Sequence, residues 1–573
     1  MARANDDVAA VLQEYADLVA ITGGDAYKVR AYEKAARSVA GFHEDVAGLD
    51  AKGLQRIPNV GRALAEKIEG FLQTGRIRQV DELRERIPAG VRELTAIPTL
   101  GPKKAMVLYE ELHIASVAEL AEAIEAGQLR DLKGFGEKTE ENIRHGIALM
   151  QQHGGRVHID VATELAEEVV RALSAVTGCR QCAYAGSLRR MRETIGDIDV
   201  LAASDESAPL MDTFARLPMV TEVIARGETK TSVRTSKDLQ VDLRVVPQAV
   251  WGAALQYFTG SKEHNVRVRE IAVRKRLKLS EYGLFDADSG DLVVSKTEAE
   301  VYERLGLQWI PPTLREDRGE VAAAARGGLP RLVEVDDMRG DLHTHTDLTD
   351  GVSSLEDMVA TAAERGYAYY AVTDHAPNLY MQRMSDEKML AQREELLRLA
   401  ERYPSMALLH GTELNIDPEG GVDWLPEFLA GFDICVASVH SHFTQSRDEM
   451  TRRVVRACEN PYVNVIGHLT ARQIGRRPPV DLDLDAVFEA CARTGTALEV
   501  NAHPHRLDLR DEHIGWARRY GVRFAIDTDA HALGHLDLMR YGVGTAQRGW
   551  LTADDVINTW PLEKLRTFLR KGR

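Results

Sequence analysis

The sequence is poor in cysteine and aromatic residues, and it contains no long apolar run. Five cysteines in 573 residues cannot form the dense disulfide framework of a small secreted scaffold, so we expect a reduced, cytoplasmic protein. Cys179 and Cys182 form a single CxxC motif, which is weak evidence for a metal or redox site without a second pair. No stretch approaches the roughly 18 apolar residues of a membrane-spanning helix, and no secretory signal pattern opens the chain. We therefore expect no membrane partner.

The chain also lacks an excess of positive charge. Its formal net charge is −16, shared equally between the parts before and after residue 338. This excludes a protein that coats nucleic acid through bulk charge, so DNA binding would need local cationic grooves, backbone amides or metal ions. One local cationic surface is present, because residues 262–278 contain seven basic and two acidic side chains. At about 150 residues per domain, the length predicts roughly four domains.

The first 152 residues predict an all-α region with a repeated hairpin. Apolar residues recur at helical spacing, and three segments share a short helix, a turn ending in glycine and a second helix. The turn glycines are Gly61, Gly101, Gly134 and Gly136. Because the first amides of a helix lack partners within the helix, such turns suit a phosphate. The segments resemble the helix-hairpin-helix module, which implies that these glycines contact the DNA backbone.

Two copies depart from the pattern of that module. Asn59 and Thr99 replace its first turn glycine in the first and second hairpins, and only Gly134 keeps it in the third. Asparagine tolerates a left-handed backbone, whereas threonine tolerates it poorly. The second hairpin is therefore expected to be the weakest binder.

A glycine-serine turn and three acidic residues follow in an α/β region that begins near residue 157. Gly186-Ser187 precedes Asp197-Ile-Asp199, and Asp242 lies further along the chain. Residues two apart on a strand face the same side, so Asp197 and Asp199 point into one space. Two carboxylates in one space require a cation, and Mg²⁺ takes carboxylate and phosphate oxygens. With Asp242 on another strand, we expect a two-metal site for nucleotidyl transfer.

These motifs, followed by Tyr257-Phe258-Thr259-Gly260-Ser261, resemble the nucleotidyltransferase palm and nucleotide pocket of family X DNA polymerases, relatives of DNA polymerase beta. The resemblance implies that Asp197, Asp199 and Asp242 are catalytic and bind Mg²⁺ or Mn²⁺. It implies that the incoming deoxynucleoside triphosphate contacts Gly186, Ser187, Arg190, Tyr257, Phe258, Gly260, Asn265 and Arg269. An aromatic ring where a 2′-hydroxyl would lie excludes ribose by steric contact.

The same resemblance gives roles to two N-terminal lysines. Lys28 falls where polymerase beta-type lyase domains place a phosphate-binding lysine, and Lys67 falls where they place the catalytic Schiff-base nucleophile. A lysine beside other cations can have its pKa lowered enough to attack a sugar aldehyde. Ala63 stands where eukaryotic relatives carry another lysine, so a solvated or phosphate-contacting Lys67 is the alternative interpretation.

Histidine is concentrated at the other end of the chain, where 12 of the 18 histidines follow residue 338. Short apolar strands alternate with helices there, which predicts a βα repeat whose site lies at the carboxyl ends of the strands. The expected strands include 369–373, 407–409, 434–438, 463–466, 497–500 and 523–526. Seven predicted strand ends carry His, Asp or Glu, more than structural histidines alone would give.

This pattern resembles the PHP (polymerase and histidinol phosphatase) domain. The resemblance implies a distorted (β/α)7 TIM-like barrel with a metal centre of up to three ions that hydrolyses phosphoesters. The implied ligands are His343, His345, Asp350, His375, Glu413, His440, His468, Asp529 and His531. Imidazole-rich sites with mixed ligands favour Zn²⁺ or Mn²⁺ over Mg²⁺. His442, His503 and His505 fall outside the motif and are candidate phosphate contacts.

The order of the motifs predicts a multidomain chain. The expected units are a lyase-like helical domain (1–84), a fingers-type helical domain (85–152), a nucleotidyltransferase palm (153–248), a thumb-type nucleotide-pocket subdomain (249–316), a linker (317–338) and the PHP domain (339–573). Together they imply a monomeric family X DNA polymerase that fills short gaps in gapped or primer-template DNA during repair. Its second site would act as a 3′–5′ exonuclease, 3′-end-processing enzyme or abasic endonuclease.

Three alternatives remain from the sequence. The first is a DNA-end phosphoesterase whose palm serves only to bind DNA. The second is a DNA-end scaffold with both sites idle, which the intact acidic residues in both sites disfavour. The third is a template-independent nucleotidyltransferase, which the three hairpins and the Tyr257–Ser261 turn disfavour.

Overall fold

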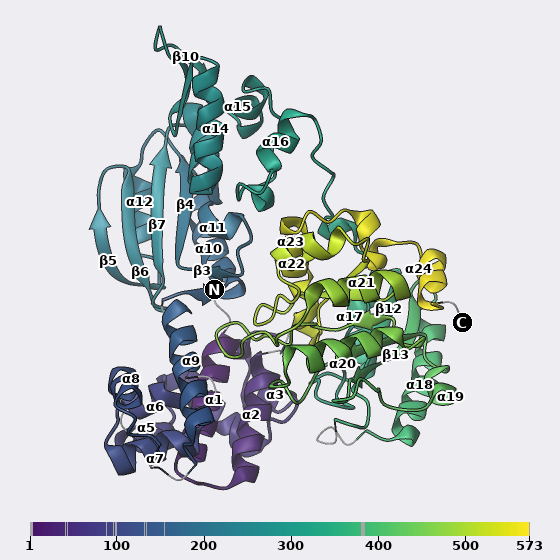
Figure 1. Ribbon diagram of the computed structural model, residues 1–573. Helices are drawn as coiled ribbons and strands as arrows, with labels where there is room; N and C mark the ends of the chain where they lie inside the picture. The colour runs from purple at the N-terminus through teal and green to yellow at the C-terminus, as the bar shows by residue number, and fades with distance from the viewer. Residues whose placement is uncertain are drawn as a thin grey trace.

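The computed structural model describes residues 4–571, apart from 41, 43, 88, 96, 98, 99, 131, 133, 154 and 380–383. Figure 1 shows an open sheet above a helical N-terminal region, with a barrel beside them. Within the described residues, no helix combines the length and apolar character needed to cross a membrane.

The described residues of the N-terminal region form helices joined by turns and loops, without a strand before residue 157, as predicted. Its helices are α1 (Ala4–Ile21), α2 (Ala26–Ala40), α3 (Ala51–Leu54), α4 (Arg62–Thr74), α5 (Arg78–Arg86), α6 (Ala89–Thr95), α7 (Pro102–Leu112), α8 (Val117–Glu125) and α9 (Glu137–His153). One apolar cluster extends from Val8 to Ile147, so the two predicted helical units share a core. Arg92 contacts Glu14 across the expected boundary at 3.0 Å, and Arg84, the last residue of the first unit, contacts the same carboxylate at 2.6 Å.

The third hairpin differs from its prediction. The first helix expected around Leu129 is wrong, because residues 126–130 form turns after α8. Gly127 adopts a φ of +69°, which ends the helical conformation there. Gly134, in the turn that follows, has a φ of +91°.

The palm is a five-stranded sheet in the order β2-β4-β7-β6-β5. Its elements are α10 (Ile159–Ser174), β2 (Gln181–Tyr184), α11 (Gly186–Arg189), β4 (Asp197–Ala203), α12 (Ala208–Ala215), β5 (Val220–Arg226), β6 (Lys230–Thr235) and β7 (Gln240–Val246), with a small β1 (Val157–His158) and β3 (Thr194–Ile195) pair beside them. Only β4 and β7 pair in parallel; the other neighbours are antiparallel. Helices α10 and α12 pack on the sheet in the same apolar cluster.

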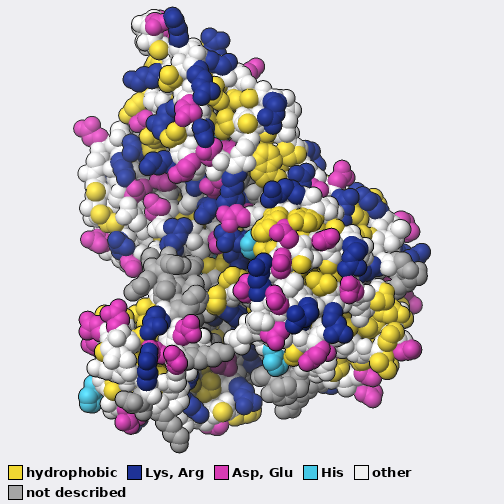
Figure 2. All heavy atoms as spheres, in the orientation of Figure 1, with side chains coloured by type: hydrophobic (Ala, Val, Ile, Leu, Met, Phe, Trp, Pro, Cys, Tyr) yellow, Lys and Arg dark blue, Asp and Glu magenta, His cyan; other side chains and the backbone are white. Residues whose placement is uncertain are grey.

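A smaller subdomain follows the palm. It contains α13 (Trp251–Thr259), α14 (Lys262–Arg274), β8 (Leu277–Ser280), β9 (Gly283–Asp286), β10 (Leu292–Val294) and α15 (Glu298–Arg304). The segment expected to be a linker carries α16 (Glu320–Ala325), and Glu320 lies 2.7 Å from the buried His264 of α14. Figure 2 shows many Lys and Arg side chains over this subdomain, in keeping with the cationic stretch at 262–278.

The C-terminal region is a seven-stranded parallel barrel, which confirms the predicted βα repeat. Its strands, in spatial order, are β11 (Gly340–Asp341), β12 (Tyr369–Val372), β13 (Ala407–Asn415), β14 (Ile434–Ser438), β15 (Val465–Ile466), β16 (Ala497–Asn501) and β17 (Phe524–Asp527). A parallel bridge between Thr344 and Ala530 joins the first and last strands at their carboxyl ends. The helices are α17 (Leu355–Glu364), α18 (Asp386–Arg402), α19 (Pro426–Leu429), α20 (Arg447–Glu459), α21 (Leu484–Thr494), α22 (Asp511–Arg518), α23 (Met539–Arg548) and α24 (Leu562–Leu569).

The barrel packs directly on the palm. Ile474, Leu507 and Tyr541 of the barrel belong to the palm's own apolar cluster. Polar contacts surround this patch, including Arg472 with Glu193 at 2.7 Å. The two units therefore share buried surface as well as a covalent connection.

Candidate active sites in the palm and the barrel

The palm sheet brings the three predicted carboxylates together at one edge. In the parallel register of β4 and β7, Asp199 lies opposite Asp242 and Asp197 lies opposite Gln240. Asp197 and Asp199 are two apart on β4 and so share a face. Burial, and then the charges of Asp197 and Asp242, raise the pKa of Asp199 to about 6. Such mutual repulsion is the condition that a divalent cation relieves.

A lysine that the motifs do not reveal faces this edge. Lys230 of β6 lies 2.7 Å from Asp242, and Gln240 donates a hydrogen bond to the same carboxylate at 2.9 Å. Burial alone would raise the pKa of Asp242, but hydrogen bonds from Lys230, Ser232 and Gln240 outweigh it and lower that pKa. Lys230 reaches Asp242 through antiparallel strand pairing, which a local sequence pattern does not contain.

The glycine-serine turn lies against the carboxylates. Gly186 begins α11 with a φ of +60°, and a Cβ atom there would lie 2.5 Å from Oδ2 of Asp199. Only glycine permits this approach without displacing the carboxylate. The turn therefore places Ser187 and the first amides of α11 next to Asp199.

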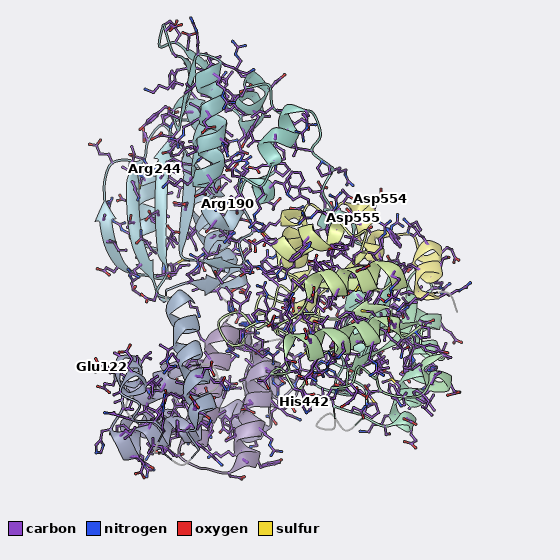
Figure 3. The ribbon with its side chains drawn as sticks, viewed as in Figure 1. Glu122, Arg190, Arg244, His442, Asp554 and Asp555 are labelled. Atoms are coloured by element: carbon purple, nitrogen blue, oxygen red, sulfur yellow. The ribbon has the colours of Figure 1, made fainter. Side chains whose placement is uncertain are left out.

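Arg190 lies at the end of the same turn. It donates a hydrogen bond to the carbonyl oxygen of Thr259 at 2.6 Å and another to Glu316 at 3.1 Å. Gly260 has a φ of +69°, and a Cβ atom there would lie 3.1 Å from the Arg190 guanidinium. Figure 3 shows Arg190 beside α11, on the side of the sheet nearer the barrel. Arg190, which is predicted to bind the triphosphate, is thus hydrogen-bonded to protein groups in this structure.

The aromatic pair lies at the end of α13. The Tyr257 and Phe258 rings are 5.2 Å apart and nearly perpendicular, and the Arg244 guanidinium lies 4.7 Å from the Phe258 ring centroid. Phe258 shares a cavity of about 70 Å³ with Asp199 and Asp242 among its lining residues. The predicted sugar contact and the acidic edge therefore face one space.

Asn265 and Arg269 lie on α14. The Asn265 amide donates to the carbonyl oxygen of Tyr257 and accepts from Gln256, both at 2.8 Å. Arg269 is exposed and donates to the carbonyl oxygen of Asn265 at 3.3 Å. Asn265 thus holds the aromatic turn in place, and contact of either residue with a base pair stays a prediction.

The hairpin glycines stand at the starts of helices. Gly61 and Gly101 are the N-cap residues of α4 and α7, and Gly136 directly precedes α9. Asn59 has a φ of +62°, the left-handed conformation expected of a residue replacing the turn glycine. Thr99 lies outside the described residues.

Lys28 and Lys67 both lie close to tyrosine side chains. The Lys67 ammonium donates a hydrogen bond to the Tyr32 hydroxyl and lies 5.3 Å from the Tyr15 ring centroid. The Lys28 ammonium lies 5.1 Å from the same Tyr15 centroid. Partial burial, assisted by the nearby charge of Lys28, lowers the pKa of Lys67. This direction favours the nucleophilic amine form.

All nine predicted barrel ligands lie at the carboxyl ends of the strands. Within the described chain, ligand-type atoms within 4.8 Å of one another form three groups, and all three are in the barrel. The groups are His345, Asp350, His375 and His531; His343, His345 and Asp529; and His375, Glu413 and His440. His468 joins them through Glu413, at 3.1 Å. The arrangement has room for more than one cation.

Glu413 is the centre of this cluster. Its carboxylate lies 2.9 Å from His375 and 3.1 Å from both His440 and His468, and it is almost fully buried. Burial alone would raise the pKa of Glu413, but the surrounding histidines hold it well below its usual value. One carboxylate among several imidazoles is a donor set suited to bridging metal ions.

Buried polar atoms test whether the site fits metal ions. Nδ1 of His345, Oδ1 of Asp350 and Nδ1 of His375 are buried and form no well-aligned hydrogen bond among the described residues, although Nδ1 of His375 lies 2.9 Å from Glu413. Buried polar atoms normally form such bonds, so this crowding of carboxylates and imidazoles fits a site that holds a further partner. A divalent cation has the ligand preference for that place.

Three further residues orient the ligands, and the sequence interpretation missed them. Glu499 lies 2.6 Å from Nδ1 of His343. Asn415 lies 2.7 Å from Nδ1 of His440, and Asn501 donates to Asp529 at 3.1 Å. Partners of this kind fix which ring nitrogen faces a metal. These residues lie at the carboxyl ends of β13 and β16, where the predicted ligands also lie. That position is the sequence signal that could have identified them.

The other candidate histidines lie around the rim. His442 is exposed, and Figure 3 shows it at the edge of the barrel nearest the N-terminal helices in this view. His503 stacks on His505, with ring centroids 5.2 Å apart. His505 in turn contacts His158 of β1, at 4.2 Å between centroids. Contact of the three rim histidines with phosphate stays a prediction.

Family models match four parts of the chain. A helix-hairpin-helix domain matches residues 3–77, and a SAM-like helix-hairpin-helix tandem matches residues 91–147. The DNA polymerase beta thumb matches residues 254–316, and the PHP domain matches residues 341–503. These matches confirm the predicted fold classes, whereas the domain boundaries given above stay a prediction.

Whole-chain comparison gives the same result. The chain is 34% identical to the DNA polymerase/3′–5′ exonuclease PolX of Bacillus subtilis (strain 168), over 99% of both chains. It is 26% identical to rat DNA polymerase lambda over 51% of this chain and 53% of that one. It is 28% identical to a probable phosphatase of Thermoanaerobacter sp. (strain X514) over 41% of this chain and 95% of that one. The chain therefore belongs to the PolX family, the family X DNA polymerases with a C-terminal PHP domain.

Proposed function

We propose that this protein is a DNA polymerase that fills short gaps during repair and processes 3′ ends with its PHP domain. The observation that carries the polymerase half is the register of β4 and β7, which sets Asp199 opposite Asp242 beside the Gly186 turn. Whole-length similarity to a polymerase with 3′–5′ exonuclease activity supports joining both activities in one chain.

In the palm, Asp197, Asp199 and Asp242 would hold Mg²⁺ or Mn²⁺, and such ions activate the primer 3′-hydroxyl and neutralise the triphosphate. The amides of Gly186 and Ser187, together with Arg190, would hold the triphosphate. Tyr257, Phe258 and Gly260 would bound the sugar, with Asn265 and Arg269 beside the base pair. Lys230 keeps Asp242 ionised, which is the form that accepts a cation.

In the barrel, the nine ligands would hold up to three Zn²⁺ or Mn²⁺ ions, which activate water and polarise the phosphate. Glu499, Asn415 and Asn501 fix the orientation of their ligands. His442, His503 and His505 would contact the DNA phosphates. We assign 3′–5′ exonuclease, 3′-end-processing or abasic endonuclease activity to this site.

The N-terminal region would grip the DNA. Amides next to Gly61, Gly101, Gly134 and Gly136 would contact backbone phosphates. Lys28 would bind a phosphate, and Lys67 would act as a Schiff-base lyase nucleophile. Gapped or primer-template DNA and deoxynucleoside triphosphates are the proposed substrates of a monomeric enzyme.

The test uses one gapped DNA substrate and measures primer extension and 3′-end degradation separately. Asp242→Ala should abolish extension and leave degradation, because it removes a palm ligand far in sequence from the barrel. His343→Ala should abolish degradation and leave extension. Extension that persists in Asp242→Ala, and also in Asp197→Ala, would show that the palm carboxylates do not carry it out and would contradict the polymerase half of the proposal. An unaltered protein that degrades 3′ ends without extending primers would be a DNA-end phosphoesterase whose palm only binds DNA.

A further inference from the structure

The contact between the barrel and the palm falls on the turn that carries Arg190. Helix α23 approaches this turn so closely that a Cβ atom at Gly544 would lie 2.4 Å from the Met191 side chain. Met191, directly after Arg190, has a φ of +55°. A close backbone approach of this kind limits the movement of the turn.

Arg548 of the PHP domain contacts the same turn. Its side chain is 4% exposed, and its guanidinium donates to the carbonyl oxygen of Arg190 at 2.8 Å. It also donates to Glu316 at 2.8 Å and to Asp511 at 2.7 Å. A charge-assisted hydrogen bond in such a buried setting is strong and geometrically restrictive.

Glu316 is shared between the two domains. Its Oε1 atom accepts both from Arg190, at 3.1 Å, and from Arg548, at 2.8 Å. Arg192 is more distant, at 4.0 Å. Burial alone would raise the pKa of Glu316, but Arg548 and Arg190 outweigh it and lower that pKa. The carboxylate is therefore ionised and needs a counter-ion.

This sharing matters when a triphosphate binds. The Nε and Nη1 donors of Arg190 are held by Glu316 and by the carbonyl oxygen of Thr259. Turning the Nε donor toward a phosphate would take a counter-ion from Glu316, and an unpaired buried carboxylate would oppose that movement. Arg189 cannot replace Arg190 as the counter-ion of Glu316, because Arg189 is paired with Glu298 at 2.8 Å. Arg548 donates to the same oxygen of Glu316 at 2.8 Å, and so it keeps the carboxylate paired when Arg190 turns away.

We propose that Arg548 of the PHP domain is a positioning residue for the polymerase reaction. Arg548 binds Glu316 and the carbonyl oxygen of Arg190, and it thereby leaves the Arg190 guanidinium available for the incoming triphosphate. This inference rests on the proposed function, in which Arg190 binds the triphosphate. It gives the PHP domain a role in nucleotide binding that is separate from hydrolysis.

The experiment measures equilibrium binding of a deoxynucleoside triphosphate to the full-length protein on gapped DNA with Mg²⁺, together with KM and kcat for extension. Arg548→Ala should weaken triphosphate binding about tenfold and raise KM for the triphosphate by the same factor. The value of kcat at saturating nucleotide should change by less than about twofold. Arg318→Ala is the matched control, because Arg318 also pairs with Asp511, at 2.9 Å. It should stay within about twofold of the unaltered protein, and neither variant should alter 3′-end degradation.

Two further variants separate positioning from simple domain attachment. In Glu316→Gln, Arg190 is released, so triphosphate binding should be at least as tight as in the unaltered protein. In the double variant Arg548→Ala/Glu316→Gln, triphosphate affinity should recover to within about threefold of that of the unaltered protein, because the carboxylate that needed Arg548 is gone.

Equal binding by Arg548→Ala and Arg318→Ala would overturn the inference. Weaker binding by Glu316→Gln, or a double variant as weak as Arg548→Ala, would also overturn it, because Arg548 would then serve only as an anchor. If the unaltered protein binds triphosphate and extends primers, such results leave the proposed function intact. If it does neither, the proposed function itself fails.

Discussion

At the scale of single residues, Gly186 shows how closely the palm site is packed. With its φ of +60°, a methyl group at this position would lie 2.5 Å from Asp199, so there is no room for a side chain. We expect Gly186→Ala to reduce primer extension about 100-fold by displacing Asp199, while 3′-end degradation is unchanged. Gly196→Ala is the control, because its methyl group would meet only the flexible end of Arg156. Equal loss in both variants would show that Gly186 has no special role.

Glu499 offers a residue-scale test of the barrel. It is fully buried and lies 2.6 Å from His343. Glu499→Gln should lower metal affinity and 3′-end degradation by about 10- to 100-fold, because His343 loses its charged partner. Metal content and degradation are measured beside Glu489→Gln, an exposed glutamate on α21. Unchanged metal content in Glu499→Gln would contradict this prediction.

Residues inside short motifs could be predicted from the sequence, and residues that reach a site from elsewhere could not. The motif residues Asp199 and Glu413 lie where strand periodicity and strand ends placed them. Lys230 reaches Asp242 through strand pairing, and Glu316 reaches Arg190 across more than 100 positions. Such contacts depend on tertiary packing, which a single sequence does not encode in any local pattern.

At the scale of elements, a buried carboxylate joins α11 to α15. Glu298 pairs with Arg189 at 2.8 Å and with the fully buried Arg315 at 2.6 Å. Burial alone would raise the pKa of Glu298, but Arg315 and Arg189 outweigh it and lower that pKa to about 2.

We expect Glu298→Gln to lower the free energy of unfolding of this region by about 3 kcal/mol at pH 7. Because the folded-state pKa is depressed, the contribution is present above about pH 4.5 and is lost as the pH falls towards 2. Calorimetry at several pH values, with the exposed Glu300→Gln of the same helix as control, measures the difference. A difference that does not shrink below pH 4.5 would contradict this assignment.

Elements with strong periodicity were predicted well. The strand expected at 434–438 is β14 (Ile434–Ser438), and the strand expected at 497–500 is β16 (Ala497–Asn501). The failure at Leu129 came from inferring a helix by analogy with the other two hairpins. The left-handed Gly127 ends the helical conformation just before the position of that expected helix.

At the scale of the whole molecule, the barrel stabilises the palm. Tyr541 of α23 is 3% exposed and lies in the palm's apolar cluster. Tyr541→Ala should lower the free energy of unfolding by about 3 kcal/mol. It should also speed amide hydrogen exchange in α10 of the palm, because the two domains share that core.

Tyr520→Ala is the matched control, since Tyr520 is 38% exposed on the barrel. Hydrogen exchange in α10 that responds to neither variant would show that the domains unfold independently, and an equal response to both would show that Tyr541 has no special role. No local pattern indicated this docking, because Ile474, Leu507 and Tyr541 have the sequence context of ordinary barrel residues.

The common core of the N-terminal helices has a mechanical consequence. Because a single apolar cluster runs from Val8 to Ile147, no hinge can open near residue 84 without exposing that core. Figure 1 shows α9 as the covalent connection from this bundle up to the sheet. Any swing of the bundle would therefore pivot after Ile147, beyond the core part of α9, and would move all the hairpins together with their spacing unchanged.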